Sequence, residues 1–91
     1  MVGLGVAALR VTVRLFAVYK EKARKGQVVL DLPDDAVVGE LAAEMARQYP
    51  ALTQRPESMV VAVNQEYQDH SFALSDGDEA ALIPPVSGGA G

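Results

Sequence analysis

The spacing of the apolar residues changes along this chain, and that change restricts the fold more than any other feature. Between residues 9 and 15 apolar and polar residues alternate, as expected of a half-buried strand, with apolar side chains at Leu9, Val11, Val13 and Leu15. A second predicted strand follows at residues 28–32, with Val28, Leu30 and Leu32 on one side. From residue 38 the apolar residues recur at helical spacing, at Val38, Leu41, Ala42, Met45, Ala46 and Tyr49. A chain with both patterns is expected to pack a helix against a sheet.

The ends of these elements are marked by turn and capping residues. Lys25-Gly26-Gln27 predicts a turn that joins the first two strands as a hairpin, and the basic stretch at residues 20–25 is interpreted as a solvated turn. Pro33-Asp34-Asp35 interrupts the second strand, and Asp35 is the candidate N-cap of the helix. Pro50 is expected to end the helix.

The second half of the chain predicts further strands. Residues 59–63 are rich in β-formers and predict a buried strand, and residues 67–72 predict a short extended segment. Asp76-Gly77-Asp78 predicts a tight turn in which Gly77 adopts a positive φ, and residues 79–83 form the last strand. The fold class is therefore α+β, a mixed sheet of four to five strands packed on one main helix, and the strand-helix-strand crossover requires some parallel pairing.

The chain of 91 residues has room for a single small domain. We expect a loose N-terminal extension at residues 1–8, the domain at residues 9–83 and a flexible C-terminal tail at residues 84–91. Pro84 and Pro85 lock φ and remove two backbone donors, so no strand can continue through them. Gly88, Gly89 and Gly91 carry no Cβ, which lets a tail pass through a slot too narrow for larger residues. Such a tail is suited to entering a site on another protein.

The residue inventory disfavours a stand-alone enzyme. The chain has no cysteine and one histidine, His70, so neither a Cys-His pair nor a histidine-based metal cluster can be assembled. His70 is interpreted as a surface turn residue, and Asp76, Asp78 and Glu79 as turn residues rather than a calcium site. The net charge is −4 and the chain has no long basic run, so the sequence does not predict nucleic-acid binding. The first nine residues suggest neither export nor membrane insertion, and the lack of cysteine fits a reducing, cytoplasmic location.

Three segments together resemble the small subunit of molybdopterin synthase, the MoaD-type sulfur carriers of the MoaD/ThiS superfamily. They are Val60-Val61-Ala62-Val63-Asn64-Gln65-Glu66-Tyr67, Leu74-Ser75-Asp76-Gly77-Asp78-Glu79 and Ala81-Leu82-Ile83-Pro84-Pro85-Val86-Ser87-Gly88-Gly89. Arg14-Leu15-Phe16-Ala17 and Val38-Gly39-Glu40-Leu41 are similar to the first strand and helix start of that family. The resemblance covers residues 11–89, and the Pro-Pro-Val-Ser-Gly-Gly ending is its most specific part.

This resemblance implies a ubiquitin-like β-grasp fold and a carrier function. Gly89 would bear the acyl adenylate and then the thiocarboxylate, after activation by a MoeB-type adenylating enzyme that uses ATP. The tail would enter a MoaE-type large subunit, where its sulfur attacks a cyclic pyranopterin. Gly88 would allow passage through a narrow channel lined by Val86 and Ser87, beyond the Pro84-Pro85 stem. Phe16 would match an aromatic partner contact on the sheet face, and the resemblance implies no bound cofactor or metal.

Two positions depart from the family pattern. The family ends at the second glycine, but this chain continues with Ala90-Gly91. Three explanations are open. A peptidase could remove these two residues, the chain could continue into a fused large subunit, or Gly91 could itself be the acceptor of the sulfur. Val37 stands where the family commonly has a capping threonine, which would weaken the helix start.

Two other functions stay open at this point. The first is a related carrier for thiamine or thionucleoside synthesis, or one that tags proteins through an isopeptide bond. The second is a non-catalytic β-grasp interaction module with an inert tail. For Phe16 itself the sequence leaves two roles, a sheet-surface residue covered by a neighbour or a contact for a partner.

Overall fold

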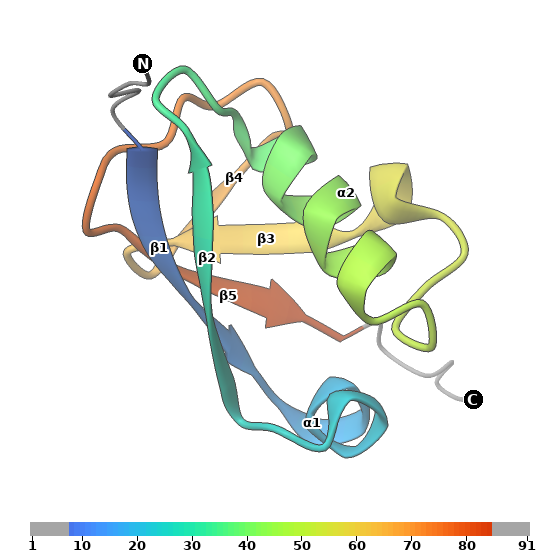
Figure 1. Cartoon of the computed structure of the whole chain (residues 1–91). Coiled ribbons are helices and arrows are strands. Elements are labelled where there is room, and N and C mark those ends of the chain that lie inside the picture. Colours follow the sequence, from blue (N-terminus) through green and yellow to red (C-terminus); the bar gives the residue numbers. More distant parts are fainter. Residues whose placement is uncertain (1–7, 85–91) are drawn as a thin grey trace.

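The computed structural model describes residues 8–84, in which five strands form one mixed sheet in the order β2-β1-β5-β3-β4 (Figure 1). β1 (Ala8–Leu15) pairs antiparallel with β2 (Gln27–Pro33) and parallel with β5 (Glu79–Ile83). β3 (Val60–Val63) pairs antiparallel with β5 and with the short edge strand β4 (Glu66–Gln68). The predicted α+β class and the predicted parallel pairing are confirmed. The last strand of the chain therefore lies in the middle of the sheet.

A short helix, α1 (Ala17–Ala23), joins β1 to β2, where we predicted only a hairpin turn and a solvated basic stretch. That prediction is wrong because seven residues make less than two helical turns, too few for a clear hydrophobic period. Tyr19 and Ala23, one turn apart, are the buried residues of α1. Arg24 ends the helix with φ 61°, and its backbone N–H donates to the carbonyl of Lys20 at 2.9 Å.

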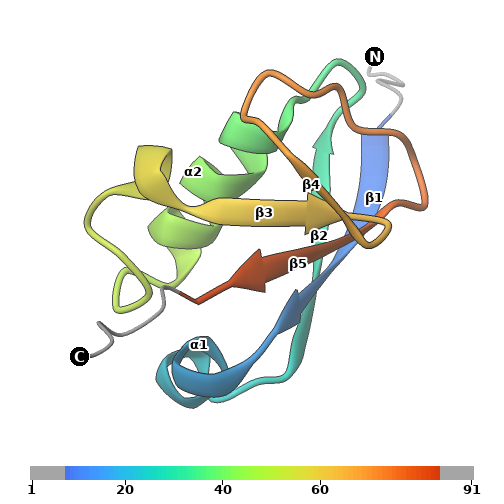
Figure 2. The ribbon, with the colours of Figure 1, turned by 180° about the vertical axis from the view of Figure 1, so that it is seen from behind.

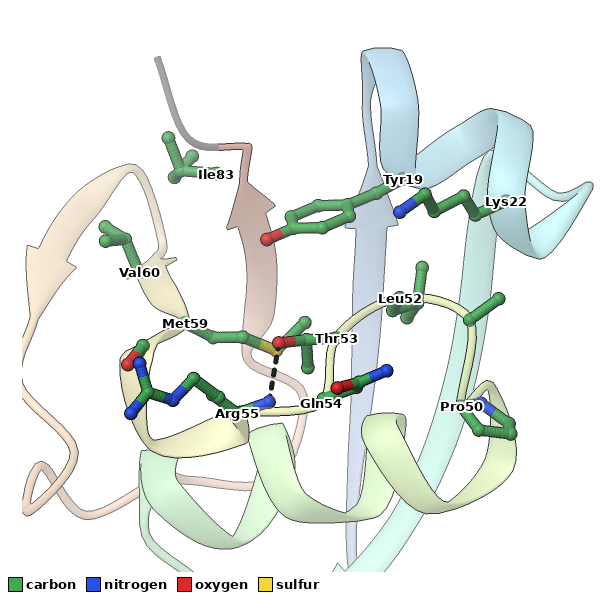
Figure 3. Close-up of a pocket in the computed structure, with 12 residues that line it drawn as sticks. Tyr19, Lys22, Pro50, Leu52, Thr53, Gln54, Arg55, Met59, Val60 and Ile83 are labelled. Carbon is green, nitrogen blue, oxygen red and sulfur yellow. Dashed lines mark hydrogen bonds between the residues drawn. The ribbon is translucent and has the colours of Figure 1, made fainter. Parts of the chain in front are cut away.

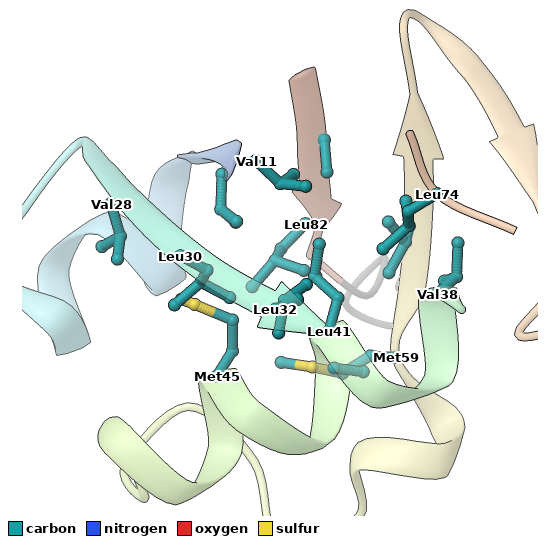
Figure 4. Close-up of a cluster of buried hydrophobic side chains, with 14 of the residues drawn as sticks. Val11, Val28, Leu30, Leu32, Val38, Leu41, Met45, Met59, Leu74 and Leu82 are labelled. Carbon is teal, nitrogen blue, oxygen red and sulfur yellow. The ribbon is translucent and has the colours of Figure 1, made fainter. Parts of the chain in front are cut away.

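The main helix, α2 (Val38–Gln48), covers one face of the sheet, as predicted (Figure 1). Its buried residues meet the inward side chains of the strands, and Figure 4 shows Leu41 and Met45 among Leu30, Leu32 and Leu82. Every buried strand position predicted from the alternation is found in this core: Leu9, Val11, Val13, Leu15, Val28, Leu30 and Leu32. This packing leaves the other face of the sheet without a helix.

The start of α2 is held by backbone carbonyls and by the side chain of Glu40, whose Oε1 accepts from the backbone N–H of Val37 at 3.0 Å. The N-cap residue is Val37, not the predicted Asp35, which lies two residues upstream. The backbone N–H of Val38 donates to the carbonyl of Phe72 at 3.0 Å, and that of Gly39 donates to the carbonyl of His70 at 2.9 Å. These bonds satisfy helix donors that a threonine cap would otherwise serve. The expected weakness at Val37 is thus offset by the segment after β4.

Several smaller predictions are corrected in the loops. The polar link before β3 contains the 3-10 helix η1 (Pro56–Ser58), and within β3 the first residue, Val60, is exposed. Only residues 66–68 of the predicted extended segment form a strand, β4. His70 is half-buried rather than a plain surface residue, because its Nε2 lies 2.7 Å from the carbonyl oxygen of Met59. Gly77 has the predicted positive φ, 88°.

Candidate functional site

No helix of residues 8–84 covers the sheet face opposite α2 (Figure 2), and this face carries a group of apolar side chains. Phe16 is 44% exposed, Val60 is 50% exposed and Tyr67 is 73% exposed. Ala81 and Ile83 on β5 are half-buried and belong to the same face, since Ala80 and Leu82 point into the core. We call these five residues the sheet-face patch. Exposed apolar groups of this kind mark interaction surfaces.

Strand pairing gathers the sheet-face patch from distant parts of the sequence. Val60 of β3 is opposite Ile83 of β5, and Ala62 lies between Ala81 on one side and Tyr67 on the other. Neighbouring strands in a sheet lie about 5 Å apart, so these side chains are close enough to act as one surface. The sequence did not reveal Val60, Tyr67 or Ile83 as surface residues. Residues 60–63 are apolar at every position, so alternation cannot assign their faces.

Phe16 occupies a fixed position at the end of β1. Its backbone carbonyl accepts hydrogen bonds from the backbone N–H groups of Tyr19 at 3.0 Å and Lys20 at 3.3 Å, which starts α1. The next residue, Ala17, has φ 51°, a left-handed conformation that turns the chain sharply. The strand therefore stops before Phe16, and the ring extends outward beside β5 instead of entering the core. Sequence analysis left two roles for Phe16, coverage by a neighbouring residue or contact with a partner. The exposed ring favours contact with a partner.

Arg14 holds one side of the Phe16 ring. Its guanidinium carbon lies 5.9 Å from the ring centroid, within the range of a cation–π interaction, and its Nη1 donates to Oε2 of Glu79 at 2.9 Å. The backbone N–H of Glu79 in turn donates to Oδ1 of Asn64 at 3.1 Å. Arg14, Phe16 and Glu79 border a shallow hollow of about 150 Å³ next to Ala62 and Ala81. The apolar patch thus has a charged but locally neutral border.

The tail begins beside this patch. β5 ends at Ile83, and the half-buried Pro84 follows it. Pro85, Val86, Ser87, Gly88 and Gly89 lie outside the described residues, as do Ala90 and Gly91. The threading and carrier roles of these residues therefore stay predictions. The structure does place the start of the tail next to Val60, at the edge of the sheet-face patch.

Within residues 8–84 there is no cluster of three or more His, Cys, Asp and Glu side chains that could hold a metal ion. Over the same residues, no helix is long and apolar enough to cross a membrane. Asp76 and Asp78 act as turn residues: Oδ1 of Asp76 accepts from the backbone N–H of Arg10 at 2.8 Å, and Oδ2 of Asp78 accepts from that of Ser75 at 2.7 Å.

Comparisons with known proteins agree with this picture. Residues 13–89 match the ThiS family. The chain is 40% identical to the molybdopterin synthase sulfur carrier subunit of Chlamydomonas reinhardtii over 84 residues, 89% of this chain and all of that protein. It resembles the crystal structure of the small archaeal modifier protein 1 of Haloferax volcanii, with 31% identity, TM-score 0.77 and coverage of 86% of this chain and 99% of the other.

A second solved structure contains a partner. It is the protein-protein complex of subunits 1 and 2 of the molybdopterin-converting factor from Helicobacter pylori, matched at 28% identity and TM-score 0.62, over 89% of this chain and the whole of that chain. The sheet order and the matched structures identify the fold as the ubiquitin-like β-grasp.

Proposed function

The chain belongs to the ThiS family, and from that membership we infer that it is the sulfur carrier subunit of molybdopterin synthase. The observation that carries this conclusion is the match over nearly the whole chain to relatives with that name, at 40% identity in two organisms. Composition is consistent with it, since the chain has no cysteine of its own to transfer sulfur. The sulfur has to come from a separate donor and be carried on the C-terminal carboxyl group of the chain.

The reaction we propose takes place at the carboxylate of Gly89. A carboxylate is a poor electrophile, so a MoeB-type enzyme joins it to the AMP part of ATP, and pyrophosphate leaves. A sulfur donor then attacks the carbonyl carbon of this mixed anhydride and displaces AMP, which yields a thiocarboxylate. In the large subunit the thiocarboxylate sulfur attacks the cyclic pyranopterin, and water later returns Gly89 to a carboxylate. The chain itself binds no cofactor in this scheme, and ATP is used by the activating enzyme.

The sheet-face patch is the docking surface in this proposal. Phe16 and Ile83 would contact a MoaE-type large subunit while Pro84 and Pro85 direct Val86, Ser87 and Gly88 into its active site. The complex of two converting-factor subunits from Helicobacter pylori supports a large-subunit partner. A docked carrier is useful because it delivers one reactive group at high effective concentration without releasing it to solvent.

Activation at Gly89 requires that Ala90-Gly91 be removed. A processing peptidase would do this whether the chain ends at Gly91 or continues into a fused large subunit. Direct activation of Gly91 is disfavoured, because Ala90 would place a methyl group where the family pattern has none. We place the reaction in the cytoplasm, where ATP is available.

The experiment is intact mass spectrometry after incubation with ATP, a MoeB-type enzyme and sulfide. A chain that ends at Gly89 should gain the mass that corresponds to exchange of one oxygen for sulfur, and a chain that ends at Pro84 should gain none. Adding the large subunit and cyclic pyranopterin should then return the carrier to its starting mass and form molybdopterin. An unchanged mass in the Gly89-ending chain would contradict the carrier function.

The likeness to an archaeal modifier protein favours one second candidate, a carrier that is also joined to other proteins. In that case a cell extract supplied with ATP should convert the Gly89-ending chain into higher-mass conjugates linked through lysine side chains. Release of the sulfur to pyranopterin without such conjugates supports the synthase function alone.

A further inference from the structure

A pocket of about 600 Å³ lies beside the point where the last strand ends (Figure 3). Tyr19 and Lys22 of α1 form one side of it, and Arg55, in the loop before η1, lies on another side. Val60 and Ile83 complete the rim nearest the tail. We call this the α1 pocket. Its volume is within the range typical of binding sites in proteins.

The charge of the α1 pocket is opposite to that of the whole protein. The chain has 12 acidic and 8 basic residues, yet the pocket lining includes Lys22 and Arg55 and no carboxylate. The Nζ of Lys25 lies 6.0 Å from the ring centroid of Tyr49, next to Pro50 of the lining, and adds a third cation nearby. None of the ion pairs within residues 8–84 involves Lys22 or Arg55. The electrostatic field of the pocket therefore favours an anionic occupant.

Tyr19 supplies a hydrogen-bond donor in the same pocket. The residue as a whole is 6% exposed, but its hydroxyl is not among the buried unpartnered atoms of residues 8–84, so the oxygen reaches the solvent of the pocket. Burial raises the pKa of Tyr19, so the hydroxyl keeps its proton at neutral pH. A hydroxyl that is accessible in a pocket can donate to a ligand there, and a carboxylate is an acceptor with room for several donors. The hydroxyl and the two cations are matched to such a group.

The position of the α1 pocket identifies the kind of occupant. Val60 and Ile83 belong both to its rim and to the sheet-face patch. A protein that covers the patch and receives the tail beyond Pro84 has to pass over the pocket. The apolar part of the lining, which includes Leu52 and Met59, suits a side chain of a folded partner better than a free ion.

We propose that the α1 pocket receives an acidic side chain of the large subunit, held by Lys22, Arg55 and the Tyr19 hydroxyl, as a second anchor beside the sheet-face patch. This proposal rests on the proposed function. The anchor would fix the orientation of the carrier about its tail, because the patch alone contacts the partner on one side of the exit point. Two separate contacts fix the orientation of the carrier relative to the large subunit, whereas a single apolar surface leaves it free to rotate.

The test compares two double variants that remove the same charge. Lys22→Gln with Arg55→Gln neutralises the pocket, and Arg10→Gln with Arg47→Gln neutralises two exposed cations that lie outside it. Titration calorimetry with the large subunit should give a Kd about tenfold or more higher for the pocket variant than for the control, because charged partners left unpaired at an interface lose affinity. The salt dependence of binding should also fall in the pocket variant. Melting temperatures check that both variants fold.

A conservative variant and a site-specific probe give independent readouts. Tyr19→Phe removes only the hydroxyl and should raise the Kd about two- to tenfold, the loss expected for one hydrogen bond. Because the chain has no cysteine, Gln54→Cys introduces a single labelling site on the pocket lining. A polarity-sensitive dye there should respond when the large subunit binds, and the same dye at Asp34→Cys, outside the pocket lining, should respond less.

Distinct outcomes separate this proposal from its alternatives. Equal affinities of the two double variants, with normal binding of the unmodified chain, would overturn the α1 pocket assignment and leave the proposed function intact. Failure of the unmodified chain to bind the large subunit would overturn both. Shifts of the Tyr19 ring signals on adding inorganic phosphate or AMP, without any partner effect, would assign the pocket to a free anion. The same shifts on deleting residues 85–91 from the isolated chain would assign it to the tail.

Discussion

Leu15 and Leu82 are opposite one another in the parallel ladder between β1 and β5. Because parallel strands run in the same direction, the residues that follow, Phe16 and Ile83, lie at the same end of the sheet. An exposed aromatic ring and the start of the tail are therefore presented together. Antiparallel pairing would have put them at opposite ends of the domain. Phe16 is far from the tail in the sequence, and it lies near the start of the tail because β5 pairs with β1.

We predict that Phe16→Ala weakens binding of the large subunit far more than it destabilises the fold. The ring is 44% exposed, so its loss removes little buried area from the free chain, whereas aromatic anchors often dominate interfaces. The expected loss of affinity is about tenfold or more, or about 1.4 kcal/mol. Calorimetric titration and thermal melting measure the two effects. Val29→Ala, at a valine of edge strand β2 that is 50% exposed on the same sheet face but two strands away from Ala81 and Ile83, is the matched control and should lower the affinity much less.

Arg14→Gln is predicted to lower the same affinity by acting through Phe16. The guanidinium is held by Glu79 at 2.9 Å and lies 5.9 Å from the ring centroid, so it restricts the orientation of the ring. We expect a loss of about two- to fivefold, because an exposed pair of this type contributes less than about 1 kcal/mol. A double-mutant cycle with Phe16→Ala tests the mechanism. If Arg14→Gln costs as much affinity in the Phe16→Ala background as in the unmodified chain, Arg14 acts directly on the partner instead.

Gly89→Ala in a chain that ends at residue 89 is predicted to abolish thiocarboxylate formation without lowering the melting temperature. The added Cβ would obstruct entry of the tail into the site of the adenylating enzyme, while Gly89 follows the last strand of the sheet in the sequence. Mass spectrometry reports the thiocarboxylate, and thermal melting reports the fold. Deletion of Gly88 and Gly89 should behave in the same way. Unfolding of either variant would mean that the tail is structural.

The long periodic elements could be predicted from the sequence, and the short ones could not. β1 and α2 each repeat their pattern over 8 or more residues, so burial of one face leaves a clear signal. α1 has 7 residues and only Tyr19 and Ala23 face the core, which no periodicity test can separate from a turn. The cap of α2 was also beyond local reasoning. Its partners, the carbonyls of His70 and Phe72, lie more than thirty residues away in sequence.

The candidate site, too, was only partly predictable from the sequence. Phe16 was recognisable because an aromatic residue breaks the alternation at the end of the first strand. Val60, Tyr67 and Ile83 join it only through the strand order β1-β5-β3-β4, which local patterns do not determine. The α1 pocket depends on a helix and a loop that sequence analysis had treated as turn and link. The residues of the tail were readable because proline and glycine have backbone properties that do not depend on context.

Gly77→Ala is predicted to destabilise the domain by about 1–2 kcal/mol, the cost of forcing a Cβ into a left-handed backbone conformation. Gly77 has φ +88°, and a Cβ built there would meet no atom within 4 Å, so strain is the only cost. Its backbone N–H also donates to the carbonyl of Arg10 at 2.9 Å, which fixes the turn against β1. Urea unfolding measures the loss. Gly77→Asn should lose less, since asparagine tolerates positive φ, and equal losses would point to a cause other than backbone strain.

The last prediction concerns the stability of α2 at low pH. Hydrogen bonds from Arg47 and Gln48 lower the pKa of Glu44 from 4.5 to about 2. The Nε of Arg47 donates to Oε1 at 3.0 Å, and Nε2 of Gln48 donates to Oε2 at 2.6 Å. A carboxyl group with a depressed folded-state pKa stabilises the fold above its unfolded-state pKa. That contribution is fully present above pH 5 and is lost as the pH falls toward 2.

The expected size is small because the Arg47 side chain is 70% exposed, and solvent screens such a pair strongly. Glu44→Gln should therefore lower the free energy of unfolding by a small amount at pH 7. The difference from the unmodified chain should shrink to nothing near pH 2, as urea unfolding at a series of pH values can measure. Added salt should reduce the difference at pH 7 as well. Glu21→Gln, on an exposed position of α1 outside the ion pairs of residues 8–84, is the control for the loss of one charge. A difference between Glu44→Gln and the unmodified chain that stays constant down to pH 2 would show that the hydrogen bonds of Glu44 do not depend on its charge.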